Sequence, residues 1–360
     1  MRVKSIQFEN FRNYKKQEIK LDAGTNLIYG DNAQGKTNIL EAVYVCGTTK
    51  SHRGGKDSEM VMFGEEESHL RMEIERDEVP YRIDMHLKKG KAKGIAVNGS
   101  PVRKASELMG LCHFIFFSPE DLGIIKDGPS VRRRFMDMEL CQLNKSYVSS
   151  LSLYQKVLDQ RNRLLKDLRT RNDLYPTLDV WDEQLVRYGR YIIGERERFA
   201  ASLNDVIAPV HRKLTGGAEE IRAVYEKNVD EDRFEEALRS GRGRDIQLGM
   251  TLTGPHRDDL SILSNGIDLK KYGTQGQQRT AALSLKLAEI ELVRQAIGDM
   301  PVLLLDDVLS ELDSGRQHFL LESIRDIQTL ITCTGVEDFR KNGFRIDSLF
   351  YVRQGEVRME

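Results

Sequence analysis

The chain has 360 residues, and its 55 Lys and Arg residues nearly balance its 56 Asp and Glu residues, so the formal net charge is −1. At about 150 residues per domain, this length predicts two or three domains. The near-zero charge excludes a histone-like polycation but allows a local basic surface. A hydrophobic content of 39% excludes an intrinsically disordered chain.

The four cysteines, Cys46, Cys112, Cys141 and Cys333, are far apart and form no CxxC pair. They indicate reduced thiols rather than a zinc knuckle or a disulfide framework. The first residues turn polar at once, which predicts no signal peptide. The most apolar window, 108–117, is about 10 residues long and too short to span a bilayer. We therefore expect a cytoplasmic protein with no membrane partner.

Short alternating segments make the first 117 residues strand-rich, and the expected strands are 3–8, 17–21, 26–29, 69–76, 81–87 and 95–98. Helices are expected from Lys36 onward and over 105–109. Between 129 and about 214, apolar residues recur at helical spacing on both sides of a turn at 172–176, which predicts an antiparallel helical pair. From about Leu248 strands and helices alternate again.

One segment fits the phosphate-binding pattern G-x-x-x-x-G-K-[ST]. It reads Gly30, Asp31, Asn32, Ala33, Gln34, Gly35, Lys36 and Thr37. Glycines let backbone N–H groups wrap a phosphate, and the helix that follows directs its positive end at the anion. Lys36 would supply charge to the phosphate oxygens, and the Thr37 hydroxyl would bind Mg²⁺. The segment predicts an ATP site.

A second site is expected where four apolar residues, 302–305, are followed by Asp306 and Asp307. This pattern is typical of the Walker B strand in a P-loop protein. Asp306 would hold Mg²⁺ through its water shell, and Asp307 would orient or deprotonate the attacking water. The expected catalytic residues are therefore Asp307, Lys36 and Asp306.

Because Lys36 and Asp306 are 270 positions apart, the nucleotide-binding fold must be split by a large insertion, the helical middle of the chain.

Residues 272–279 precede an expected helix and resemble the signature motif of ABC-type ATPases. In that family the motif binds the γ-phosphate held by the opposite subunit, which implies nucleotide contacts for Thr274, Gly276 and Gln277. The alternative is a plain loop whose Thr caps a helix. Residues 309–313 resemble the D-loop of the same family, which implies such a contact for Asp313.

Further motifs follow one another along the chain. They are Phe11-Arg12-Asn13-Tyr14, the P-loop with Asn38 after it, Lys50-Ser51-His52-Arg53, Ser118-Pro119-Glu120-Asp121-Leu122, Arg132-Arg133 with Phe135 and Asp137, Gly254-Pro255-His256-Arg257-Asp258-Asp259, and Ser310-Glu311-Leu312-Asp313. In this order they resemble the RecF family of bacterial recombination-mediator ATPases, relatives of the SMC proteins. The resemblance implies an α/β fold of the ABC/SMC type: a P-loop ATPase head at 1–118 and 246–360, split by an inserted α-helical arm domain at 119–245.

The resemblance also implies a function in recombinational repair and in the repair of replication gaps. It implies ATP and Mg²⁺ as cofactors, and an ATP-dependent homodimer on double-stranded or gapped DNA near single-strand gaps. Slow, DNA-stimulated hydrolysis would reset the dimer. The implied partner is RecR, and RecO and RecA would act indirectly, in the loading of RecA.

The sequence departs from the ABC pattern at several positions. Thr274 replaces the usual Ser but keeps a hydroxyl, and Asp307 replaces the usual catalytic Glu. No glutamine lies at the Q-loop position, where Ser118 or Glu120 would stand in, and residues 330–334 contain no switch histidine. We therefore expect slow turnover.

A DNA-binding surface is expected on the helix at 145–171, which carries seven basic residues against two acidic ones. Such a helix would neutralise phosphates without reading sequence. The candidates are Arg161, Arg163 and Lys166, together with Arg53 after the P-loop helix. The alternative is a solvated helix face.

Other functional classes are less well supported. An ABC transporter subunit is disfavoured by Asp307, by the missing Q-loop glutamine and by the helical arm. A nuclease-linked ATPase is disfavoured because only 47 residues follow the D-loop. Another SMC-like ATPase subunit, or an ATP-dependent scaffold that does not hydrolyse ATP, remains an alternative.

Overall fold

The computed structural model of the chain describes residues 1–337, 339 and 344–360. The described chain divides into two compact units. Unit 1 comprises Met1–Asp121 and Glu289–Glu360, and unit 2 comprises Leu122–Ala288. Within the described residues, no helix is both long enough and apolar enough to cross a bilayer.

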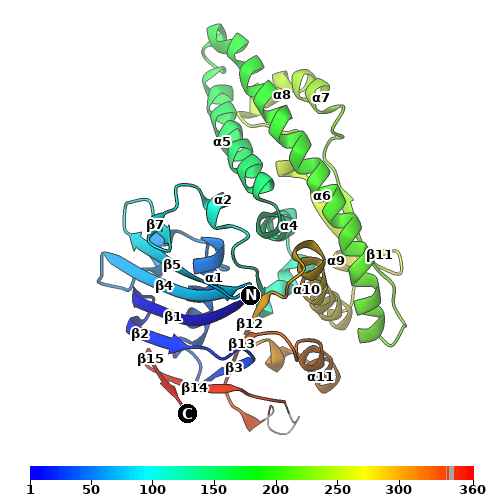
Figure 1. Ribbon diagram of the computed structural model, residues 1–360. Coiled ribbons are helices and arrows are strands. Elements are labelled where there is room, and N and C mark those ends of the chain that lie inside the picture. The colour runs from blue at the N-terminus through cyan, green and yellow to red at the C-terminus, as the bar shows by residue number, and fades with distance from the viewer. Residues whose placement is uncertain (338, 340–343) are drawn as a thin grey trace. The chain divides into compact units, whose positions relative to one another are not determined.

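One sheet of unit 1 is antiparallel, with the strand order β2-β1-β4-β5-β6-β7 (Figure 1). Its strands are β1 (Arg2–Phe11), β2 (Tyr14–Lys20), β4 (Glu67–Arg76), β5 (Val79–Lys88), β6 (Gly94–Val97) and β7 (Ser100–Pro101). Along β4, every second residue from Ser68 to Ile74 is buried. One face of the sheet therefore packs into the core and the other faces solvent.

The second sheet of unit 1 has the order β15-β14-β3-β13-β12-β8, and all its strands except β15 are parallel. The strands are β3 (Thr25–Tyr29), β8 (Phe114–Phe117), β12 (Val302–Asp306), β13 (Thr329–Cys333), β14 (Ser348–Arg353) and β15 (Glu356–Met359). β8 and β12 are buried along their whole length. This burial explains their uninterrupted apolar sequences, which are typical of parallel strands covered on both faces.

Helix α1 (Lys36–Thr48) contacts strands of both sheets of unit 1. Every residue from Ile39 to Thr48 is buried, as expected for a helix that is mostly apolar around its circumference, and this stretch includes the charged residue Glu41. Gly47 allows a close approach to β8, because an added Cβ would lie 2.2 Å from the Phe114 ring. The other elements that lie wholly in unit 1 are η1 (Asp57–Met60), α2 (Ala105–Leu108), η5 (Val308–Glu311) and α11 (Ser314–Ser323).

Unit 2 is mainly helical. Its helices are α3 (Gly123–Lys126), α4 (Pro129–Leu143), α5 (Lys145–Asp167), η3 (Asn172–Thr177), α6 (Leu178–Leu214), α7 (Phe234–Ser240), α8 (Arg242–Leu248), η4 (Pro255–Arg257) and α9 (Leu269–Tyr272). Strands β9 (Ile221–Glu226), β10 (Asp259–Ser264) and β11 (Ile267–Asp268) form a small antiparallel sheet. The turn η2 (Pro119–Leu122) and helix α10 (Gln275–Ile297) each have residues in both units. Helices α5 and α6 pack along each other (Figure 1).

The predicted P-loop helix and the predicted helical pair around a turn near 172–176 are confirmed as α1 and as α5, η3 and α6. The division into units differs from the expected domains at both boundaries, slightly at the first and strongly at the second. Residues 119–121 were expected in the arm but belong to unit 1, and residues 246–288 were expected in the ATPase head but belong to unit 2. The physical reason for the second difference is strand pairing, because β10 pairs with β9 and places Ser261 opposite Val224. Pairing between segments so far apart leaves no local signal in the sequence.

Candidate nucleotide-binding site

The expected nucleotide residues of unit 1 gather at the carboxyl edge of the parallel sheet. The P-loop follows β3, Asp306 ends β12, and Thr332 on β13 pairs in register with Asp306. Ser118 follows β8, whose last residue, Phe117, pairs with Leu305. Ligands of open α/β sheets bind at this edge, because loops from several strands meet there.

Two P-loop glycines occupy backbone conformations that exclude a side chain. Gly30 has φ 149°, and an added Cβ would lie 2.3 Å from the carbonyl oxygen of Val352. Gly35 has φ 111°, and its Cβ would lie 2.5 Å from Asn13 Nδ2. The glycines thus let the loop curve tightly where a phosphate would be wrapped.

Lys36 is buried, with 4% of its surface exposed. Its Nζ donates to the carbonyl oxygens of Gly30 at 2.7 Å and Asp31 at 3.0 Å. The ammonium group therefore lies inside the loop, at the N-terminus of α1, where the helix dipole also favours an anion. Asp31, Asn32 and Ala33, at the tip of the loop, are exposed.

The Thr37 hydroxyl and the Asp306 carboxylate meet directly, although they are 269 positions apart. Thr37 Oγ1 donates to Asp306 Oδ1 at 2.7 Å, and Thr332 Oγ1 donates to the same oxygen at 2.8 Å. A hydroxyl and a carboxylate beside a phosphate loop form the oxygen set that Mg²⁺ takes in such sites. The residues present therefore fit a magnesium–nucleotide complex.

Asp307 has the left-handed conformation, with φ 50°, which is costly for a residue other than glycine. Its backbone N–H donates to Thr332 Oγ1 at 3.0 Å. Burial raises the pKa of its carboxyl group, the ammonium group of Lys36 acts in the opposite direction, and the neighbouring Asp306 adds to the rise. Asp307 lines a cavity of about 460 Å³ together with Asn32, Ser310, Thr332 and Thr334. The carboxyl group thus borders a space beside the P-loop.

Asn13, Tyr14 and Gln354 hold the P-loop in place. The sequence pattern did not single out any of them on its own. Asn13 Nδ2 donates to the Gln34 carbonyl at 3.0 Å and Tyr14 Oη to that of Gly35 at 3.1 Å. The backbone N–H of Gln354 donates to Gln34 Oε1 at 2.7 Å. Only the position of Asn13 and Tyr14 in a family-like motif could have signalled this role, because their partners are at least 21 residues away.

A fully buried carboxylate, Glu41, connects further motifs to α1. Arg12 binds it with two nitrogens, at 2.8 and 2.6 Å, and Ser51 Oγ donates to it at 2.5 Å. Although burial acts to raise the pKa of Glu41, hydrogen bonds from Arg12 and Ser51 hold it below its ordinary value. Arg53 lies 3.9 Å from Glu41 and donates to Asn38 Oδ1 at 3.3 Å. The expected nucleotide residue Asn38 also donates to Asn13, at 2.9 Å.

The signature-like residues form the N-terminus of α10 in unit 2. Gln277 N–H donates to Thr274 Oγ1 at 3.2 Å, and Thr274 N–H donates to Gln277 Oε1 at 3.0 Å. These reciprocal bonds are a capping box, so Thr274 caps α10. Gln277 Nε2 also donates to Glu219 Oε1 at 3.1 Å. Thr274 and Gly276 are exposed.

The remaining candidates for the nucleotide site are the D-loop residue Asp313 and the two possible replacements for the Q-loop glutamine, Ser118 and Glu120. Asp313 caps α11 by accepting from Arg316 N–H at 3.0 Å, and it is exposed. Ser118 directly follows β8 and donates its N–H to Asp121 at 2.7 Å, whereas Glu120 is exposed on η2. Ser118 is thus the candidate that lies at the same sheet edge as Asp306.

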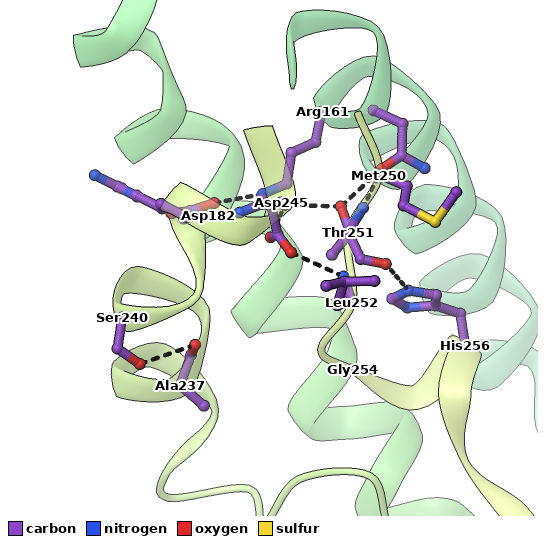
Figure 2. A network of polar contacts seen from close by, with 12 residues as sticks. Arg161, Asp182, Ala237, Ser240, Asp245, Met250, Thr251, Leu252, Gly254 and His256 are labelled. Atoms are coloured by element: carbon purple, nitrogen blue, oxygen red, sulfur yellow. Dashed lines mark hydrogen bonds and ion pairs between the residues drawn. The ribbon is translucent and has the colours of Figure 1, made fainter. Parts of the chain in front are cut away.

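The prediction that Arg161 binds DNA is wrong. Arg161 has 0% exposed surface, and Figure 2 shows its guanidinium among polar groups of unit 2. It binds Asp182 at 2.6 Å, Asp245 at 2.7 Å and Thr251 at 2.8 Å. The sequence carried a signal for this burial, since Arg161 falls on the apolar stripe of α5 with Val157 and Leu165.

Arg163 and Lys166, the other candidates on α5, are exposed. They are not on the buried stripe of the helix. Arg53 is also exposed, with 38% of its side-chain surface accessible. These three cations remain predicted DNA contacts.

Comparison with known proteins gives one consistent family. The family described as RecF/RecN/SMC N terminal domain matches residues 2–357. The DNA replication and repair protein RecF of Agathobacter rectalis is 57% identical over 359 residues, which cover 100% of this chain and 99% of that protein. The protein of the same name from Lachnoclostridium phytofermentans is 57% identical, with 99% of both chains covered.

Comparison with solved structures gives the same family. The recombination mediator protein RecF with ATP, described in the RecFOR pathway, superposes with a TM-score of 0.93 at 36% identity, covering 99% of this chain and 97% of that one. An Smc head bound to the C-winged helix domain of ScpA superposes with a TM-score of 0.58 at 15% identity, covering 100% of this chain and 97% of that one, which shows a shared fold alone. The predicted α/β fold of the ABC/SMC type is confirmed. With a family match over nearly its whole length and relatives identical at more than half of their positions, the chain belongs to the RecF family.

Proposed function

We propose that this chain is an ATP-dependent DNA-binding protein of replication-gap repair. In the proposed cycle, ATP and Mg²⁺ bind to unit 1, and two copies then associate head to head on double-stranded DNA near a single-strand gap. Slow hydrolysis, stimulated by DNA, resets the dimer. The observation that carries the proposal is the 2.7 Å bond between Thr37 and Asp306, which unites the P-loop with the Walker B strand.

Lys36, Thr37 and Asp306 would hold the magnesium–nucleotide complex. The bound metal supplies charge neutralisation at the phosphates. Lys36 is already buried in the loop, and Asp306 is held in position by two hydroxyl groups. A RecF structure described with ATP, 36% identical to this chain, supports ATP as the nucleotide.

Asp307 would orient or deprotonate the attacking water. The raised pKa of its carboxyl group suits a proton acceptor better than an ordinary aspartate. Its side chain is one methylene shorter than the usual glutamate, and Thr334 lies in the region where related ATPases carry a histidine. Both departures favour slow turnover. A non-hydrolysing scaffold is the alternative, and phosphate release measured with and without DNA distinguishes the two.

The signature-like residues would act on the second copy. Thr274, Gly276 and Gln277 would contact the γ-phosphate held by the partner's P-loop, and Asp313 would contact the nucleotide as the D-loop residue. The exposed start of α10 supports this assignment, because a helix N-terminus with a capping hydroxyl favours an anion.

The proposed protein partner is RecR, and RecO and RecA act indirectly through the loading of RecA at gaps. The description of a similar structure in the RecFOR pathway and the names of the curated relatives support this assignment. Arg53, Arg163 and Lys166 are the proposed DNA contacts. They are exposed cations and would bind phosphates without base specificity.

Sedimentation velocity tests the proposal. The chain is measured with ATP and Mg²⁺, with and without gapped duplex DNA, and a dimer is expected only when ATP is present. Thr37→Val removes the metal-binding hydroxyl at nearly constant volume and should abolish the dimer. Thr170→Val, at an exposed threonine of unit 2, should leave it unchanged. A wild-type chain that stays monomeric under all conditions would overturn the sandwich mechanism.

A further inference from the structure

We propose that unit 1 carries a binding site for a divalent transition-metal ion, such as Zn²⁺, formed by Glu67, His69 and His86 on the solvent face of the antiparallel sheet. The site is separate from the P-loop and uses none of its residues. Among the described residues, these three side chains are the group whose metal-ligating atoms all lie within 4.8 Å of one another.

Strand register brings the two histidines together. β4 and β5 are antiparallel, with His69 opposite His86 and Glu67 opposite Lys88. Directly opposed residues have Cβ atoms about 4.5–5.5 Å apart. The backbone therefore holds the two side chains close at their Cβ atoms, and the imidazole rings stack with centroids 4.4 Å apart and planes inclined by 7°.

The Glu67 carboxylate is the third ligand, and it lies at the next position along the same face of the sheet. Glu67 and His69 are two residues apart on β4, so they point to the same side of the sheet. His86 Nε2 lies 3.2 Å from Glu67 Oε2. Two imidazoles and one carboxylate are ligands that Zn²⁺ and its neighbours accept, with open positions left for water. Mg²⁺ and Ca²⁺ prefer oxygen ligands and suit this set poorly.

The surroundings leave room for an ion. His69 and His86 line a cavity of about 830 Å³, together with Glu9, Arg71 and Gly94. Gly94 lies opposite His86 on β6, so no side chain from that strand covers the imidazole. Glu9 lies opposite His69 on β1 and also lines the cavity.

Binding requires two local rearrangements. The nearly parallel imidazole rings of His69 and His86 would turn about their side-chain bonds so that one nitrogen of each points at the ion. Lys88 Nζ donates to Glu67 Oε2 at 2.8 Å, and the ion would displace this ammonium group from the carboxylate. The side chains of Lys88 and Glu67 are 39% and 41% exposed, so the displaced ammonium would be hydrated, and an exposed ion pair of this kind contributes little stability.

The test is calorimetric titration of the full chain with Zn²⁺ alone, in the absence of nucleotide. One ion per chain is expected, and His69→Gln and His86→Gln should each weaken binding at least tenfold. His318→Gln is the matched control, because His318 is an exposed histidine outside the cluster. Wild-type affinity in both cluster variants would overturn the proposal, as would the absence of binding to the wild-type chain.

Zinc binding by cysteines must be distinguished from binding at the histidine cluster, because Cys141 and Cys333 are only partly buried. The absorption spectrum of the Co²⁺-loaded wild-type chain provides this readout without any variant. Imidazole and carboxylate ligation should give weak visible bands and no thiolate charge-transfer band in the near ultraviolet. A strong thiolate band, or loss of Zn²⁺ binding in a Cys141→Ser, Cys333→Ser double variant, would contradict the assignment.

Discussion

Arg161 shows how a single cation can contribute to the interior of unit 2. Two aspartates, Asp182 and Asp245, bind it, and Arg242 binds the second oxygen of Asp182 at 2.8 Å. Burial acts to raise the pKa of Asp245, which is the direction expected for a carboxyl group removed from water. These buried arginines and aspartates therefore stabilise one another, because an unpaired charge in a protein interior is costly.

Arg161→Leu should lower the unfolding free energy of unit 2 by about 3–5 kcal/mol, because it leaves a buried carboxylate without its partner. Arg163→Leu, two positions away on the exposed face, should change it by less than about 0.5 kcal/mol. Urea unfolding followed by fluorescence measures both values, since the only tryptophan, Trp181, lies on α6 in unit 2. Weakened DNA binding with unchanged stability in Arg161→Leu would contradict the burial.

His256 is a second residue whose charge state matters to unit 2. Its Nε2 lies 2.9 Å from the Thr251 carbonyl, which can only accept a hydrogen bond, so this nitrogen carries the proton. Nδ1 lies 2.7 Å from the Tyr154 hydroxyl and accepts from it. Burial lowers the pKa of His256 to about 4, and the guanidinium groups of Arg257, Arg133 and Arg161 act in the same direction.

Unit 2 should therefore lose stability on acidification. Below pH about 6.5 the unfolded chain binds a proton at His256, whereas the folded chain does not until the pH approaches 4. The stabilisation is complete above pH 6.5 and is lost progressively as the pH falls to about 4. Between pH 7 and 5 the loss from this residue is about 2 kcal/mol. His256→Gln keeps a donor and an acceptor but cannot titrate, so its Trp181-detected unfolding should show a correspondingly smaller pH dependence. Equal slopes for both proteins would refute this assignment.

At the scale of elements, the Thr274 hydroxyl at the N-terminus of α10 has two roles. Thr274 caps the helix within the unit and is also the proposed contact to a phosphate on another copy. The capping box extends to Glu219 through Gln277, and Glu219 lies 3.5 Å from the buried His211 Nε2. The geometry of the signature residues therefore depends on the end of α6.

Two substitutions separate these roles. Thr274→Asn keeps a good capping group, so helix stability should stay nearly unchanged, while the ATP-dependent dimer should weaken because the hydroxyl is lost. Thr274→Val should lose both the dimer and about 1 kcal/mol of stability. Thr274→Ser is the control that keeps both functions. Thermal unfolding and sedimentation with ATP measure the two effects, and a full-strength dimer in Thr274→Asn would argue against phosphate contact.

Some of these elements and contacts could be predicted from the sequence, and others could not. The P-loop, α1 and β12 were predictable, because each has a dense local pattern of glycines or apolar residues. The contacts of Glu41 and Asn13 were not, because their partners come from segments that meet only in the folded sheet. The burial of Arg161 was predictable in principle, since its spacing from Val157 and Leu165 is that of an apolar stripe, but the charge count over 145–171 gave every cation equal weight.

At the scale of the whole molecule, hydrolysis and dimer lifetime should be coupled through Asp307. Asp307→Asn should slow phosphate release by about 10²-fold or more, because the proposed proton acceptor is removed. Asparagine tolerates the left-handed conformation at this position, so the backbone should not change. The ATP-bound dimer should consequently persist in sedimentation. Asp326→Asn, at an exposed aspartate of unit 1, should behave as wild type. Normal turnover in Asp307→Asn would show that another group activates the water.

The strand order of the parallel sheet has a consequence for biosynthesis. β3, which precedes the P-loop, has β13 and β14 as its neighbours, and both are translated about 300 residues later. At about 5–20 residues per second, the ribosome needs about 15–60 s to supply them. β1, β2, β4 and β5 can pair long before that time, whereas both edges of β3 stay without their native partners. The nascent chain should thus acquire nucleotide affinity late and abruptly, after β13 and β14 have left the ribosome.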